Sequence, residues 1–305
     1  MQTWKKLGKI FNPLGKSDWM ETHAQVPIVL PLTQNVYRIY FSSRDKIQRS
    51  QVSYIEIDIR SPNKILKLSK EPILKYGKLG YFDEHGVYPS SLNRVGDSLY
   101  LYYIGWNQGA TYPMFYASIG LAKSIDNGLT FKKCFKAPIL SRCEHDPWMV
   151  TAPFVLSDQD KWRMYYVSGL DWDTNYEGKL SSKYHIKYAE SLDGVTWERD
   201  GHVCIELHDS SEANIARPFV ILEKGVYKMW YSYTRNGPYQ IGYAESNDGK
   251  NFIRKDEEIQ FIGLQTDFDN EMMCYAYIFT HLEETYMVYN GNSFGLEGFG
   301  LAVLT

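Results

Sequence analysis

Residues 217–252 read RPFVILEKGVYKMWYSYTRNGPYQIGYAESNDGKNF, and most of the chain consists of variations on this stretch. A hydrophobic segment begins at a proline, ends at the turn Glu-Lys-Gly and is followed by the aromatic segment YKMWYSY. A third segment, IGYAES, runs into the polar turn Asn-Asp-Gly. Short apolar and aromatic segments separated by glycine-containing turns predict antiparallel β-strands joined by hairpins.

The pattern recurs roughly every sixty residues, which is typical of a repeat architecture. The first segment of each further copy is centred on a proline, or in the last copy on an alanine: Pro27, Pro89, Pro153 and Ala276. Four antiparallel strands repeated five times predict an all-β protein, a five-bladed β-propeller that forms one domain over residues 1–305. A large β-sandwich would also contain short strands, but it would not repeat them in a constant register.

The two ends of the chain resemble complementary parts of one repeat. The last residues, GFGLAVLT at 298–305, match the third strand of the pattern. The N-terminal TWKK at residues 3–6 matches TFKK at residues 130–133, where the fourth strand of another repeat begins. We therefore expect residues 1–11 to complete the last blade, so that the ring closes without an unpaired edge strand.

Composition and charge argue against several classes of protein. The chain has 305 residues, 25 of them tyrosine, and a formal net charge of −3, which does not favour a nucleic acid or a membrane as a partner. Its four cysteines lack a paired spacing and are expected to be free thiols. The sequence shows no secretory leader and no run long enough to span a membrane, so we expect a cytoplasmic protein.

The strand order predicts the position of a binding site. The loop before the first strand and the loop after the second strand of each repeat lie at one end of the ring, which we call the mouth. Carboxylates in the loops before the first strands are candidates for proton transfer in sugar chemistry. Glu212 is the first choice, followed by three others: Glu84, Asp146 and Glu271. The alternative for each is a solvated loop acid or a structural salt bridge.

Other side chains of the same loops are candidates for contacts with a substrate, because arginine binds phosphate or hydroxyl oxygens and indole rings stack on sugars. They are His23, Gln25, Arg44, Asp45, His85, Trp106, Asp171, Trp172, Asn214, Arg217 and Arg235. Salt bridges and packing between repeats are the alternatives for the arginines and tryptophans. Histidines of neighbouring repeats could hold a metal, but polar contacts are favoured, and neither a metal nor a cofactor is predicted.

Polar turns of the form Ser-x-Asp stand out in the third strand of three repeats. Their serine and aspartate can hydrogen-bond to the backbone of the turn, and a following glycine can adopt a positive φ. The turns begin at Ser124, Ser191 and Ser246. Because they fall at the end of the ring opposite the mouth, we interpret them as structural.

The full repeat, P-x-V…Y-x-M-x-Y…Y-A-x-S-x-D-G-x-x-W, resembles the five-bladed propeller glycosidases over essentially the whole chain. This superfamily includes arabinanases and xylosidases, invertases and levansucrases, and mannoside phosphorylases. The resemblance implies catalytic carboxylates at three positions near the repeat prolines. This chain has Val26, Ala152 and Ala216 there, so none of the three is carried over.

The resemblance implies a carbohydrate-active protein that takes a small-molecule or oligosaccharide substrate. A glycoside hydrolase that uses carboxylates at the mouth is favoured. A propeller that binds carbohydrate without catalysis is the first alternative, and the missing superfamily carboxylates support it. A phosphorylase or glycosyl-transfer enzyme, in which arginines bind phosphate, is the second.

Overall fold

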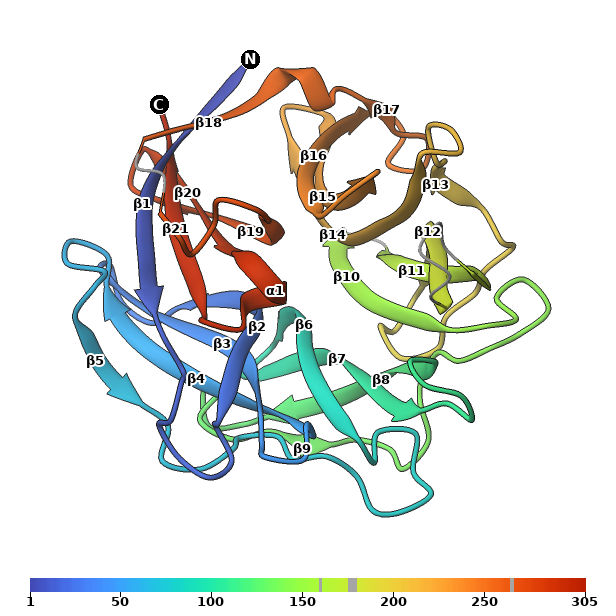
Figure 1. Cartoon of the computed structure of the whole chain (residues 1–305), viewed down its shortest axis with the longest axis horizontal. Helices are drawn as coiled ribbons and strands as arrows, with labels where there is room; N and C mark the ends of the chain where they lie inside the picture. Colours follow the sequence, from blue (N-terminus) through green and yellow to red (C-terminus); the bar gives the residue numbers. More distant parts are fainter. Residues whose placement is uncertain (159–160, 175–179, 264–265) are drawn as a thin grey trace.

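The computed structural model describes residues 1–158, 161–174, 180–263 and 266–305, and these residues form three β-sheets arranged around a common centre (Figure 1). Besides the strands there are only two short helical segments among the described residues, the 3₁₀-helix η1 (Asp256–Glu258) and α1 (Asn292–Gly295). The predicted all-β class is therefore confirmed.

The first sheet contains two repeats of the sequence pattern. Its strands are β2 (Thr22–Pro31), β3 (Val36–Arg44), β4 (Ser50–Asp58), β5 (Ile65–Leu68), β6 (Gly86–Val95), β7 (Ser98–Gln108), β8 (Phe115–Ser124) and β9 (Lys132–Lys133). Within each repeat the neighbouring strands are antiparallel. The two repeats are joined by one parallel pair, Ser50 with Gly86.

The second sheet repeats this arrangement. Its strands are β10 (Val150–Asp158), β11 (Lys161–Thr174), β12 (Leu180–Ser191), β13 (Val203–Ile205), β14 (Glu212–Glu223), β15 (Val226–Arg235), β16 (Tyr239–Ser246) and β17 (Ile253–Arg254). A single parallel pair, Tyr184 with Asn214, again joins its two antiparallel repeats.

The third sheet brings the two ends of the chain together (Figure 1). Its strand order is β18 (Ile259–Gly263), β1 (Gln2–Phe11), β21 (Phe299–Leu304), β20 (Glu284–Asn290) and β19 (Cys274–His281). β1 pairs with β21 in the antiparallel sense, with Trp4 opposite Leu304, and Trp4 is completely buried. The N-terminal TWKK thus adds a strand to the C-terminal repeat.

The first strand of each repeat lies nearest the centre in Figure 1, and we call these five the inner strands: β2, β6, β10, β14 and β19. Each inner strand has a register shift against its neighbour close to the repeat proline or to Ala276. Proline cannot donate a ladder hydrogen bond, and a bulge accommodates it while redirecting the neighbouring side chains. The bulges therefore shape the centre of the molecule.

The Ser-x-Asp turns lock neighbouring repeats together. The glycine of each turn has a positive φ, and its carbonyl accepts a hydrogen bond from a buried tyrosine of the preceding repeat. The donors and acceptors are Tyr40 with Gly128 (2.9 Å), Tyr102 with Gly194 (2.7 Å) and Tyr165 with Gly249 (2.8 Å). The serines also bond to the turn backbone, as the structural interpretation predicted.

Candidate functional site

The register of each repeat brings the start of the inner strand beside the end of the second strand. Glu212 of β14 pairs with Arg235 of β15, and Gly86 of β6 pairs with Trp106 of β7. The loops predicted to form the mouth are therefore neighbours within each repeat. Most of the predicted acids in these loops already have strong partners.

A buried carboxylate before the inner strand recurs as an ion pair within its own repeat. Asp83, whose side chain is 1% exposed, binds the Lys133 ammonium at 2.5 Å and accepts a hydrogen bond from Tyr103 at 3.1 Å. In the last repeat, Asp269 binds Lys6 at 3.1 Å and accepts from Tyr289 at 2.8 Å. Both lysines are the fourth residue of the matching phrases TFKK and TWKK.

Asp146, one of the predicted catalytic acids, occupies the same place in the third repeat. Its fully buried carboxylate binds Arg199 at 2.8 Å and Lys187 at 3.3 Å, and it accepts a hydrogen bond from Tyr166 at 3.1 Å. Two cations and a phenol contact it, so the loss of any one of them would leave a buried charge incompletely paired. A catalytic role for Asp146 stays a prediction.

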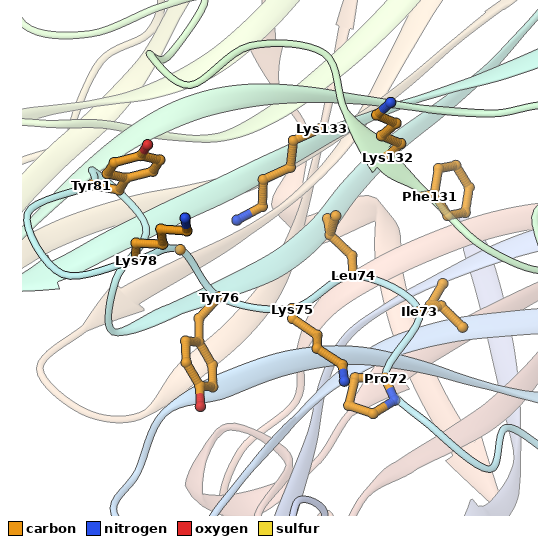
Figure 2. Close-up of a pocket in the computed structure, with 11 residues that line it drawn as sticks. Pro72, Ile73, Leu74, Lys75, Tyr76, Lys78, Tyr81, Phe131, Lys132 and Lys133 are labelled. Atoms are coloured by element: carbon orange, nitrogen blue, oxygen red, sulfur yellow. The ribbon is translucent and has the colours of Figure 1, made fainter.

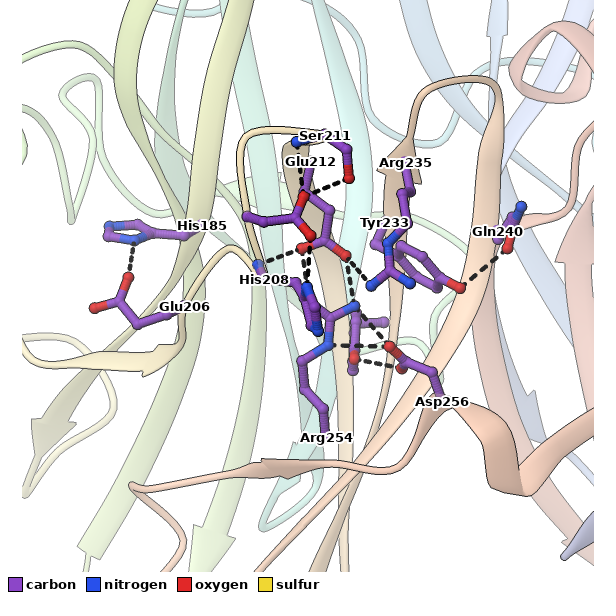
Figure 3. Close-up of polar contacts among 12 residues, drawn as sticks. His185, Glu206, His208, Ser211, Glu212, Tyr233, Arg235, Gln240, Arg254 and Asp256 are labelled. Carbon is purple, nitrogen blue, oxygen red and sulfur yellow. Dashed lines mark hydrogen bonds and ion pairs between the residues drawn. The ribbon is translucent and has the colours of Figure 1, made fainter.

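Glu212, the preferred acid, lies in the equivalent network of the fourth repeat (Figure 3). Arg254 binds both of its oxygens, at 2.6 and 2.8 Å, and Arg235 donates to it at 2.8 Å. Burial acts to raise the pKa of the Glu212 carboxyl, but the contacts with Arg254, the His208 N–H and Arg235 outweigh burial and lower its pKa. The group is thus held ionised, and the proton donor that a general acid requires is disfavoured.

The Glu84 carboxylate accepts a hydrogen bond from the Gly80 N–H at 2.5 Å, which lowers its pKa. This hydrogen bond stabilises the loop before β6.

Glu271, the last predicted acid, is exposed, and its carboxylate has no hydrogen bond or ion pair within the described part of the chain. It lines a pocket of about 320 Å³ together with Tyr233, Tyr239 and Asp269. Glu271 is therefore the predicted acid most available to a ligand.

A cluster around Arg44 lies at the end of β3. Arg44 donates to Gln25 at 3.0 Å and contacts the Tyr88 hydroxyl at 3.4 Å. His23 has a φ of 61°, and burial together with the charge of Arg44 lowers its pKa to about 3. Asp45, by contrast, binds the N–H groups of its own turn and Arg49. The structure thus joins three predicted contact residues and assigns Asp45 to the turn.

The predicted aromatic platforms are half-buried at two separate places. Trp106 donates to Ser50 at 2.9 Å and packs against His85, with ring centroids 5.6 Å apart. Trp172 packs edge-on against Phe115 at 5.4 Å. The neighbouring Asp171 is exposed and accepts from the Trp172 N–H.

The remaining predicted residues come from the fourth repeat. Asn214 lies at the junction of β12 and β14, where its amide, with nitrogen and oxygen exchanged so that both are satisfied, donates to the Ser182 carbonyl at 2.8 Å. Arg235 is more than a third exposed and lies against the Tyr233 ring, 5.5 Å from its centroid. Arg217 is buried beside the inner strands of other repeats and contacts Ser90 at 3.5 Å.

Some tyrosines near the predicted contact residues were not among the predicted site residues. Tyr88 and Tyr275 immediately precede a repeat proline or its alanine equivalent, as Arg217 does, and both are half-buried. Tyr184 and Tyr239 form a close hydroxyl pair between β12 and β16. The position before the repeat proline was the available signal, because it lies at the bulge of the inner strand.

The positions matched to the superfamily carboxylates lie at these bulges as well. Val26 and Ala152 have φ values of 56° and 45°, and Ala216 is buried beside Arg217. A valine with positive φ is uncommon, since its branched side chain crowds the backbone there. The inner strands thus keep a strained geometry at Val26 and Ala152, and none of the three positions carries an acid.

A second hollow lies beside the first sheet. The pocket of about 410 Å³ in Figure 2 is formed by the segment after β5 and by β9, and its lining residues are Pro72–Lys78, Tyr81 and Phe131–Lys133. One of its lysines, Lys133, is already bound to Asp83. Across the residues that the structure describes, no group of three or more His, Cys, Asp or Glu side chains is arranged to hold a metal ion. None of the helices in those residues is long and apolar enough to cross a membrane.

Several solved structures with a similar fold are glycoside hydrolases. A glycoside hydrolase is similar with a TM-score of 0.75 and 16% identity, over 98% of this chain and 91% of that chain. A thermostable family-43 glycoside hydrolase has a TM-score of 0.66 and 20% identity, over 96% and 91%. The Bombyx mori GH32 β-fructofuranosidase BmSUC1 has a TM-score of 0.60 and 15% identity, over 92% and 61%. The fold is therefore that of the propeller glycosidases, as the repeats predicted.

A closer relationship is found in sequence. The chain is 38% identical over 303 residues to uncharacterized protein Rv1502 of Mycobacterium tuberculosis strain H37Rv, which is 99% of each protein, and it belongs to the same family. Protein MT1551 of strain CDC 1551 matches to the same extent. No family model matches the chain.

Proposed function

We propose that the protein is a carbohydrate-active enzyme of the glycosidase type, built as one five-bladed propeller domain over residues 1–305. The five inner strands, each followed by antiparallel partners, support this number of blades. The pairing of β1 with β21 supports a last blade completed by residues 1–11.

The single observation that carries the proposal is the clustering of polar loops at the mouth on a fold shared with glycoside hydrolases over 98% of the chain. Arg44, Gln25 and Tyr88 form a connected group of donors and acceptors there. Trp106 and Trp172 offer half-buried indole faces of the kind that stack on sugars. The ligand is accordingly a small sugar or an oligosaccharide.

Glu271 is the carboxylate that best suits proton transfer, because it is exposed, unpaired within the described residues and part of a pocket wall. Glu212, Glu84 and Asp146 act in this proposal through the groups that they hold. Glu212 fixes Arg235, which is exposed enough to reach a ligand. Glu84 and Asp146 fix the loops before their inner strands.

Two other functions have specific support. Binding of carbohydrate without turnover is supported by Val26, Ala152 and Ala216 at the positions of the superfamily carboxylates. Phosphorolysis or sugar transfer is supported by Arg217, a buried cation without a carboxylate partner among the described residues. A cytoplasmic location remains a prediction.

The test is a glycan array with the full chain, followed by turnover assays on every glycan bound, with and without inorganic phosphate. Glu271→Gln is compared with Glu283→Gln, an exposed acid at the opposite end of β19 that serves as the matched control. Loss of general acid or base catalysis lowers the rate by about 10²- to 10⁴-fold. We expect this loss for Glu271→Gln only.

The outcomes separate the three functions. If turnover depends on phosphate, the protein is a phosphorylase and not a hydrolase. If a glycan is bound but not turned over, the protein is a carbohydrate-binding protein without catalytic activity. If turnover is equal in Glu271→Gln and Glu283→Gln, the role of Glu271 is refuted. If no glycan is bound or cleaved, the carbohydrate proposal is wrong.

A further inference from the structure

Arg217 is a buried arginine at the centre of the molecule, and its side chain is only 1% exposed. Its φ is 52°, and it lies in the bulge of β14 between Ala216 and Phe219. A bulge redirects the side chains of its strand, and such features are frequent near active sites. Here the guanidinium reaches Ser90 of β6. β6 is the inner strand of a different repeat and lies at the centre beside β14 and β10 (Figure 1).

Most of the hydrogen-bonding capacity of this guanidinium is unused. Nη1 contacts the Ser90 hydroxyl at 3.5 Å, whereas Nε and Nη2 are buried without a hydrogen-bond partner. Nε and Nη2 form one edge of the planar group, and their N–H bonds are parallel. This geometry matches two oxygens of a carboxylate or phosphate in a bidentate contact.

The charge of Arg217 is also uncompensated. No Asp or Glu within residues 1–158, 161–174, 180–263 and 266–305 forms an ion pair with it, whereas the half-buried or buried Arg38, Arg199 and Arg254 each bind a carboxylate. Burial lowers the pKa of Arg217 to about 10, which still leaves the side chain protonated at neutral pH. A buried cation without a counter-ion is strongly unfavourable, so the site is suited to an anion.

Two tyrosines of β19 lie near Arg217, and one of them also lies near the mouth. Tyr275 and Tyr277 of β19 are the titratable groups that interact electrostatically with Arg217. Tyr275 also interacts with Tyr88 and Arg44, the pair in contact at the mouth. Tyr88 and Tyr275 are only half-buried, so this side of the centre is partly open.

We infer that Arg217 binds an oxyanion, the carboxylate or phosphate group of a ligand that enters through the mouth, with its Nε and Nη2 edge. The inference rests on the proposed carbohydrate function and narrows the ligand to an anionic sugar or to a sugar accompanied by phosphate. Arg44 supplies a second positive charge at the mouth, along the path of the entering ligand. A neutral sugar alone would leave the Arg217 charge unpaired.

The experiment is isothermal titration of the full chain with three probes: glucuronic acid, inorganic phosphate and glucose. Arg217→Gln removes the charge, and Arg217→Lys keeps it but lacks the bidentate fork. Arg94→Gln, an exposed arginine bound to Asn127 away from the mouth, is the control. We expect Arg217→Gln to weaken binding of the anionic probe by about 10- to 100-fold, Arg217→Lys to weaken it less, and Arg94→Gln to leave it unchanged.

The probes distinguish the source of the oxyanion. Binding of glucuronic acid but not phosphate indicates an acidic sugar, and the reverse indicates a phosphate-using site. Equal anion affinity in Arg217→Gln and Arg94→Gln, or no anion bound by the unaltered protein, overturns the inference. Binding of glucose without any anion overturns the inference but leaves the proposed function standing. Phosphate binding that depends on Arg217, with neither glucuronic acid nor glucose bound, supports the oxyanion site, and the glycan array then decides the carbohydrate function.

Folding of the variants is checked by their thermal midpoints without ligand. Removal of an unpaired buried charge removes its desolvation cost, so we expect Arg217→Gln to be at least as stable as the unaltered protein. If Arg217→Gln does not fold, Arg217→Lys decides the question. An anion affinity of Arg217→Lys equal to that of the unaltered protein then overturns the inference.

Discussion

Replacement of Lys6 by methionine tests whether the ends of the chain are held by a buried ion pair. Lys6 Nζ lies 3.1 Å from Asp269, and the two side chains are 8% and 1% exposed. Methionine keeps most of the side-chain length but removes the charge. Among the described residues, Tyr289 and Thr266 are then the remaining side-chain hydrogen-bond donors to the buried Asp269. Removal of one partner from a buried pair costs about 3–5 kcal/mol. This is a large part of the total stability of a typical domain.

The assay is urea unfolding followed by tryptophan fluorescence, with Lys5→Met as the control, because Lys5 is the exposed neighbour on the same strand. We expect Lys6→Met to lower the free energy of unfolding by about 3–5 kcal/mol and Lys5→Met by less than about 0.5 kcal/mol. The double variant Lys6→Met/Asp269→Asn removes both charges and should recover much of the loss, which a double-mutant cycle measures. Equal midpoints for Lys6→Met and Lys5→Met would refute the reasoning.

Three further predictions concern stability. Tyr102→Phe leaves the Gly194 carbonyl without its donor and should cost about 1–3 kcal/mol in urea unfolding, whereas Tyr112→Phe, at an exposed tyrosine, should cost nothing measurable. His23 has a folded pKa of about 3, below its unfolded value, so the unfolded chain binds more protons and stability falls as pH drops from about 6.5 towards 3. His23→Asn, which tolerates positive φ, should flatten this dependence, and an unchanged slope would contradict the account. Deletion of residues 1–11 removes buried Trp4 and Lys6 and should abolish the folded monomer in circular dichroism and size-exclusion chromatography, whereas deletion of exposed Met1 should not.

The fold could be predicted from the sequence because of the repeats. Prolines, aromatic strands and Ser-x-Asp turns are local features, and each one specifies a strand or turn that the structure contains. The similarity of TWKK and TFKK also predicted that the chain ends meet, although its chemical reason emerged only in three dimensions. The last lysine of each phrase reaches a buried aspartate of its own repeat.

The candidate site was harder to predict from the sequence, because loop carboxylates with catalytic roles and those with structural roles have the same sequence pattern. Glu212 and Asp146 looked like free acids, yet their arginine partners Arg254 and Arg199 lie more than forty residues away in the chain. The backbone geometry of the site could not be predicted from the sequence either. The bulges that direct Arg217 and Tyr275 towards the centre depend on the pairing of whole strands, which no local pattern encodes.

The most direct test of the claim that ligands enter at the mouth and reach Arg217 is a crystal structure of the full chain soaked separately with glucuronic acid and with phosphate. The account predicts ligand oxygens within hydrogen-bond distance of Arg217 Nε and Nη2, with the remainder of the sugar directed towards Arg44 and Tyr88. It is contradicted if the anions occupy only the lysine-lined pocket at residues 72–78, or if Arg217 is found paired with a carboxylate of the protein itself.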